Sequence, residues 1–151
     1  MLPILHDWDT SDDERRALPY RGALFVTRPT AATLAFVEFA RELVEEAFAP
    51  VHPEMAQHHH DVSEYVDILT TLKPRFIHHP RSKEHIRAVL AERGRDLELT
   101  YIDVPRLRTS TSHGYLTGGL AYAWHRHRDT WYSAPQSQSN FWMPVYDIEA
   151  G

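Results

Sequence analysis

Apolar residues recur at helical spacing between Pro29 and Pro50. The apolar positions are Phe36, Val37, Ala40, Leu43, Val44, Ala47 and Phe48. Side chains three and four residues apart share one face of a helix, so the stretch predicts an amphipathic helix, and Pro29 suits its first turn. Four glutamates between residues 38 and 46 fall on the opposite face, where we expect a solvated helix surface.

A second helix is predicted to start at Asp61 and to end at Pro74. Asp61 and Glu64 have the spacing of a capping box, with Asp in place of the usual Ser or Thr. The apolar stripe that follows consists of Val62, Tyr65, Val66, Leu69 and Leu72. We expect Pro74 to end the helix, because proline cannot donate a hydrogen bond to the preceding turn.

A third helical stretch precedes a change of pattern. It runs from about Ser82 to Arg93, and Gly94 stands where a left-handed C-terminal cap is expected. Beyond it, apolar and polar residues alternate, which is typical of β-strands. The predicted strands span residues 97–102, 120–129 and 138–146.

The order of these elements predicts an α+β fold, because helices fill the first two-thirds of the chain and strands follow. Residues 23–27 predict an additional short strand, and residues 1–20, with charged clusters and two prolines, predict an irregular arm. The chain has 151 residues, of which 42% are hydrophobic, enough for one ordinary core. We therefore expect a single domain, with a helical support over 1–95 and strands over 96–151.

Composition excludes several classes of function. The 16 basic residues are outnumbered by 21 acidic ones and form no basic stripe, so we expect no nucleic-acid partner. The chain has no cysteine, so a metal could be bound only by nitrogen and oxygen ligands. Because the chain also lacks a Gly-x-Ser-x-Gly elbow, a nucleophilic hydrolase is disfavoured. No signal peptide or membrane-spanning run is recognisable, so we expect a cytoplasmic protein that acts on a small molecule.

The strand predicted over residues 120–129 contains the candidate metal-binding residues. His125, His127 and Asp129 stand at alternate positions and therefore share one face of that strand. Neighbours on that face lie roughly 6 to 7 Å apart, close enough for two side chains to reach one ion. A His-x-Asp pair supplies two of the three ligands in the two-histidine, one-carboxylate triad of non-haem Fe(II) enzymes.

The sequence around this pair resembles a known family. His127-Arg128-Asp129-Thr130-Trp131-Tyr132 is followed by a short loop and by Asn140-Phe141-Trp142-Met143-Pro144-Val145. The combination resembles the Fe(II)- and 2-oxoglutarate-dependent oxygenases of the phytanoyl-CoA dioxygenase-like kind, which are built on a double-stranded β-helix, or jelly-roll. The resemblance covers residues 97–150, and the helices before it are consistent with the family's N-terminal support.

The resemblance implies that His127 and Asp129 bind Fe(II) and that the strand carrying Trp142 lies near the 2-oxoglutarate site. Gln138 and Asn140 are candidates for hydrogen bonds to the cosubstrate, or else to neighbouring backbone. The family couples decarboxylation of 2-oxoglutarate, which yields succinate and CO2, to hydroxylation or a related oxidation of a C–H bond. Protein groups tune and shield the metal.

The family's second histidine, and usually an arginine that binds 2-oxoglutarate, come from strands far downstream of the His-x-Asp pair. Here 22 residues follow Asp129, and none is His, Arg or Lys. We therefore expect an N-terminal part of a longer enzyme, or a truncated relative, whose 151 residues alone bind iron poorly and catalyse nothing. His125 is either a third ligand or a packed residue beside the metal, while His113 and the His58–His60 run contribute only if loops bring them in.

Two alternatives remain open. Gly119 with His125 and His127 matches the opening of a cupin metal motif, although aromatic residues stand where that motif has its glutamate and Asp129 is the available substitute. The other alternative is a non-catalytic binding domain with an aromatic binding surface. That surface would consist of Tyr122, Trp124, Trp131, Tyr132 and Trp142.

Overall fold

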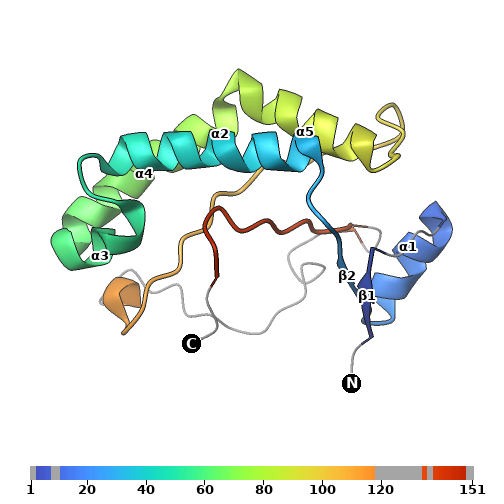
Figure 1. Ribbon diagram of the computed structural model, residues 1–151, viewed down its shortest axis with the longest axis horizontal. Helices are drawn as coiled ribbons and strands as arrows, with labels where there is room; N and C mark the ends of the chain where they lie inside the picture. Colours follow the sequence, from blue (N-terminus) through green and yellow to red (C-terminus); the bar gives the residue numbers. More distant parts are fainter. Residues whose placement is uncertain (1–2, 8–10, 118–133, 136–137, 149–151) are drawn as a thin grey trace. The chain divides into compact units, whose positions relative to one another are not determined.

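The structure is a computed structural model that describes residues 3–7, 11–117, 134–135 and 138–148 (Figure 1). The described residues form two compact units. The first comprises those up to Pro29 together with those from 134 to 143, and the second comprises those from Thr30 to 117 together with 144–148. The fold of each unit is described separately below.

The first unit contains a small parallel sheet with a helix between its strands. Strand β1, Ile4–His6, pairs with β2, Leu24–Val26, and Ile4 lies opposite Leu24. Helix α1, Asp12–Tyr20, connects them. The strand predicted near residues 23–27 is confirmed, whereas the irregular arm predicted over residues 1–20 is wrong.

Helix α1 begins with a capping box that the sequence already contained. The Ser11 side chain accepts a hydrogen bond from the Glu14 backbone N–H at 3.3 Å, and the Glu14 carboxylate accepts one from the Ser11 backbone N–H at 3.2 Å. This reciprocal pair satisfies backbone donors that the first helical turn leaves unpaired. The Ser-x-x-Glu spacing was therefore the missed signal for a helix in the N-terminal region.

The second unit is built on helix α2, Ala31–Phe48, as the sequence predicted. Thr30 caps its start by accepting a hydrogen bond from the Thr33 backbone N–H. One face is buried, and its residues are Thr33, Phe36, Phe39, Ala40, Leu43, Val44 and Phe48. Helix α4, Val62–His78, and helix α5, Pro80–Glu92, both pack against α2 (Figure 1). The apolar stripe seen in the sequence is therefore the centre of the hydrophobic core.

Helix α4, Val62–His78, has the predicted start but not the predicted end. Asp61 and Glu64 form both hydrogen bonds of the capping box, at 2.9 and 3.2 Å. The helix then continues past Pro74 by four residues. Phe76, only 4% exposed, packs beyond the proline on the aromatic residues of α2, and we attribute the continuation to this burial, which offsets the lost backbone hydrogen bond.

We expect Asp61→Ala to lower the free energy of unfolding by about 1 kcal/mol, since it removes the acceptor for the Glu64 backbone N–H. Urea unfolding followed by far-UV circular dichroism measures the change. Asp67→Ala is the matched control, because Asp67 is an exposed carboxylate inside the same helix. An equal loss in both variants would show that the capping box contributes nothing specific.

Helix α5, Pro80–Glu92, ends two residues before Gly94, the glycine that the sequence predicted as its C-terminal cap. Gly94 has φ +68°, and its N–H donates to the Ala91 carbonyl at 2.9 Å. The Arg95 N–H donates to the Leu90 carbonyl at 3.0 Å. These two bonds form a Schellman motif, which requires a left-handed residue that glycine adopts without strain.

An aromatic cluster joins α2, α4 and the start of α5. The Phe39 ring lies 6.1 Å from Phe76, 4.9 Å from His79 and 5.1 Å from His85, measured between centroids. The Arg81 guanidinium lies 4.5 Å from the Phe39 centroid. Burial and the neighbouring Arg81 lower the pKa of His85, so a neutral imidazole is favoured within this cluster.

Two short helical turns connect α2 to α4. The first, η1, spans Pro53–Met55, and helix α3, Ala56–His59, follows it directly. His58 and His59, from the histidine run noted in the sequence, thus lie in a short helix, and His60 follows it. The Tyr115 hydroxyl, from the turn η2 at Tyr115–Thr117, donates to the His60 carbonyl at 2.7 Å.

No strand occurs among the described residues after α5, where strands were predicted. In the predicted strand 97–102, the Thr100 hydroxyl and the Leu99 N–H both bond back to the Asp96 carbonyl, which makes a turn. Tyr101 is 92% exposed. Residues 138–146 likewise form no strand, and the strand predicted over 120–129 lies outside the described residues. Alternating apolar and polar residues make a segment suitable for a β-strand, but the strand forms only beside a hydrogen-bonded neighbouring strand. The jelly-roll stays a prediction.

Candidate functional site

The predicted iron ligands His127 and Asp129, and their neighbour His125, lie outside the described residues. The three predicted cosubstrate residues are described, and all are exposed. The structure brings two of them together, because the Gln138 side-chain amide donates to the Asn140 side-chain carbonyl at 2.8 Å. Trp142 is 73% exposed. The two amide side chains therefore lie together at the protein surface.

The remaining histidines do not assemble a metal site in the part of the chain that the structure describes, where no three His, Asp or Glu side chains converge suitably. His60 lies 3.6 Å from Glu64, measured from Nδ1 to Oε2, and belongs to the packing between α3 and α4. His113 is exposed and has φ +55°. Neither is placed with a second and third ligand among these residues.

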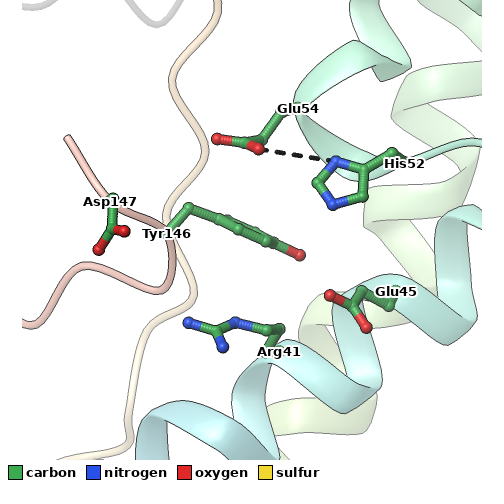
Figure 2. A pocket seen from close by; sticks show the side chains of 6 residues that line it. All are labelled: Arg41, Glu45, His52, Glu54, Tyr146 and Asp147. Atoms are coloured by element: carbon green, nitrogen blue, oxygen red, sulfur yellow. Dashed lines mark ion pairs between the residues drawn. The ribbon is translucent and has the colours of Figure 1, made fainter. Parts of the chain in front are cut away.

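The second unit contains a cleft of about 630 Å³ that sequence reasoning missed (Figure 2). Its lining residues are Arg41, Glu45, His52, Glu54, Tyr146 and Asp147. They come from α2, from the turn around η1, and from the segment 144–148. Glu45 was predicted only as part of a solvated helix face. No sequence pattern links positions about a hundred residues apart, so the cleft could be found only from the tertiary structure.

Arg41 fixes one wall of this cleft. Its Nε and Nη2 donate to the Val145 carbonyl at 3.3 and 2.9 Å, and its Nη1 pairs with Glu38 at 3.2 Å. The guanidinium also lies over the Tyr146 ring, 5.6 Å from its centroid. These contacts hold the segment 144–148 on α2 and occupy all three guanidinium nitrogens, so Arg41 is a structural cation rather than a free anion-binding group.

Tyr146 stands at the centre of the cleft. The His52 ring meets it edge-on at 5.8 Å between centroids, and the Nδ1 of His52 lies 3.7 Å from the Glu54 Oε2. Burial, followed by the charge of Glu45, raises the pKa of Tyr146 to about 12, against a lowering effect of Arg41. The phenol is therefore protonated at neutral pH. Its buried hydroxyl has no hydrogen-bond partner among the described residues.

Comparison with known proteins adds no relative. No family model matches the sequence, and neither a curated protein nor a solved structure shows significant similarity to it. Among residues 3–7, 11–117, 134–135 and 138–148, no helix is both long and apolar enough to cross a membrane. The proposed function therefore rests on the residues of this chain alone.

Proposed function

We propose that this chain belongs to a non-haem Fe(II)- and 2-oxoglutarate-dependent oxygenase of the phytanoyl-CoA dioxygenase-like kind, acting on a small organic substrate in the cytoplasm. One observation carries the proposal: the His127-x-Asp129 pair is followed at short distance by the segment from Asn140 to Val145. An isolated His-x-Asp pair is a weak pattern, and the aromatic and amide residues after it make the resemblance more specific.

The donor set suits the proposed metal. An imidazole from His127 and a carboxylate from Asp129 are the ligand types that non-haem Fe(II) enzymes use, and the chain has no thiolate that would favour another metal. Bound iron and 2-oxoglutarate would supply the oxidising chemistry, with succinate and CO2 as coproducts. The chain's own residues would hold the metal and orient the cosubstrate.

The described amides support the cosubstrate assignment in chemical terms. The exposed side chains of Gln138 and Asn140 lie within hydrogen-bond distance of each other, and a side-chain amide is a group that can donate to a carboxylate. Trp142 follows two residues after Asn140 and is 73% exposed, so an apolar ring is also accessible in this segment. In this proposal Gln138 and Asn140 position 2-oxoglutarate, and neither residue takes part in the chemistry.

An anaerobic Fe(II) titration of the 151-residue chain, followed by paramagnetic broadening of the histidine ring resonances in NMR spectra, tests the proposal. We expect weak binding centred on His127. His127→Ala and Asp129→Ala should each weaken it by about tenfold or more, since each removes one of few ligands. Adding 2-oxoglutarate should then shift the side-chain amide resonances of Gln138 and Asn140.

Two matched variants serve as controls for this titration. His59→Ala and Asp67→Ala remove an exposed imidazole and an exposed carboxylate from helices and should leave iron binding unchanged. If His125→Ala abolishes binding while Asp129→Ala does not, the cupin-type ligand set is correct instead. If Fe(II) broadens no histidine resonance, the oxygenase proposal is wrong and a binding domain becomes the better description.

A further inference from the structure

His79 lies where helix α4 ends and helix α5 begins, and its side chain caps the start of α5. The Nδ1 of His79 accepts a hydrogen bond from the Arg81 backbone N–H at 3.2 Å. A ring nitrogen accepts such a bond only while it carries no proton, so this cap requires a neutral imidazole. The dipoles of α4 and α5 act on a charge at this position in opposite directions. The main effect of protonating His79 is therefore the loss of the cap.

A second histidine, His85, packs on the aromatic residues of α2. Its ring stacks on Phe36 at 5.7 Å and on Phe39 at 5.1 Å, measured between centroids. His79 contacts the same Phe39 ring at 4.9 Å, and the Arg81 guanidinium lies 4.5 Å from its centroid. Three side chains that can carry a positive charge thus surround one ring that is only 1% exposed.

The charged groups that face this cluster come from α2 and α5. The Arg81 Nη1 lies 3.4 Å from the Glu42 carboxylate of α2. Burial, followed by the charge of Arg81, lowers the pKa of His85. Glu84 of α5 and Glu42 act in the opposite direction and are outweighed. Helix α4 contributes the apolar ring of Phe76, so the neutral form of His85 is favoured in the folded chain.

We propose that the junction of α4 and α5 is a pH-sensitive switch, closed while His79 and His85 are neutral and opened by their protonation. Acid removes the cap from the first turn of α5 and adds positive charge around Phe39, beside Arg81. Both changes favour release of the start of α5 from α2.

The direction of the pH dependence follows from the lowered pKa of His85. The stability that its neutral ring provides is complete above the ordinary histidine pKa of about 6.5, and it is lost as the pH falls through the lower folded-state value. Loss of the His79 cap acts in the same direction, because only the neutral ring accepts the hydrogen bond. The switch is independent of the oxygenase function and of its iron ligands.

Amide hydrogen exchange measured by NMR on the 151-residue chain tests the switch. The protection factor of each α5 amide compares its exchange rate with that of an unstructured peptide at the same pH, so it reports opening of the helix. We expect these factors to fall about tenfold from about pH 7.5 to about pH 5.5, a range in which histidines titrate and most carboxylates stay charged. The amides in the first half of α4 are the internal reference and should change by less than about twofold.

Two variants remove the titrating groups and keep the contacts. His79→Asn supplies a side-chain oxygen that can cap α5 at either pH, and His85→Phe keeps an aromatic ring on Phe36 and Phe39. Each should reduce the response to about threefold, and the double variant should reduce it below about twofold. His78→Asn is the matched control, because His78 is the neighbouring exposed histidine at the end of α4, and it should respond as the wild type does. Circular dichroism at neutral pH confirms that each variant is folded.

The wild-type measurement alone can overturn the proposal, since α5 protection factors that do not fall on acidification would refute it. An equal fall in the α4 reference amides would also refute it, because that result would mean general destabilisation by acid. A full response in the double variant would refute it as well, and so would a His78→Asn variant that loses as much of the response as His79→Asn. None of these measurements involves iron or 2-oxoglutarate, so the two proposals fail separately.

Discussion

Phe39→Ala is expected to lower the free energy of unfolding by about 3–5 kcal/mol, the range typical for removing a buried aromatic ring. Phe39 is 1% exposed and lies among Phe76, His79 and His85, with the Arg81 guanidinium over its ring. The substitution loses apolar burial, leaves a cavity between three helices and removes the cation–π contact.

Urea unfolding followed by far-UV circular dichroism measures this loss. Phe39→Leu should give an intermediate loss. If Phe39→Ala is too unstable to give a folded baseline, the intermediate loss of Phe39→Leu still supports the prediction. Leu34→Ala is the matched control, because Leu34 is on the same helix and is 58% exposed. We expect its effect to stay within about 0.5 kcal/mol. Similar losses for Phe39→Ala and Leu34→Ala would contradict the packing described for α2.

Ser82→Ala is expected to cost about 2 kcal/mol, although it removes only one oxygen atom. Ser82 is fully buried, and its hydroxyl donates to the Phe76 carbonyl at 2.5 Å, across the junction of α4 and α5. The Phe76 carbonyl retains only a longer bond, of 3.4 Å, from the His79 N–H. Loss of the serine therefore leaves a buried acceptor poorly satisfied and loosens the angle between two helices.

Thermal unfolding of Ser82→Ala beside Ser63→Ala measures this contribution, since Ser63 is an exposed serine in the first turn of α4. The lower stability should appear only in the Ser82 variant. Ser82→Thr provides a further comparison, because it keeps the hydroxyl but adds a methyl group to a site with no exposed surface. A Ser82→Ala variant as stable as the wild type would show that the hydrogen bond contributes no net stability.

Local sequence signals predicted the helices of the second unit because those signals act over a few residues. The stripe from Phe36 to Phe48, the Asp61 and Glu64 capping box, and Gly94 each specify a structure through neighbours one turn away. The same kind of signal at Ser11 was present but overlooked, since the acidic and proline-rich surroundings of α1 resemble a loop.

Local sequence patterns could not predict features that depend on contacts with residues far away along the chain. Pro74 ends a helix by local rules, yet Phe76 packs on α2 and the helix continues. The alternating residues from 97 to 102 have a strand-like pattern, yet they begin with a turn and form no strand, because alternation does not supply a pairing neighbour.

Local sequence patterns were enough to predict the helical core of the second unit, because amphipathic periodicity and capping are properties of nearby residues. The iron-binding role of His127 and Asp129 also comes from a local pattern, and it stays a proposal. Only the tertiary structure placed Tyr146 against Arg41 and brought Glu45 and His52 to the same cleft. The physical reason is separation along the chain. Contacts between segments about a hundred residues apart depend on how whole helices pack, and no local spacing records them.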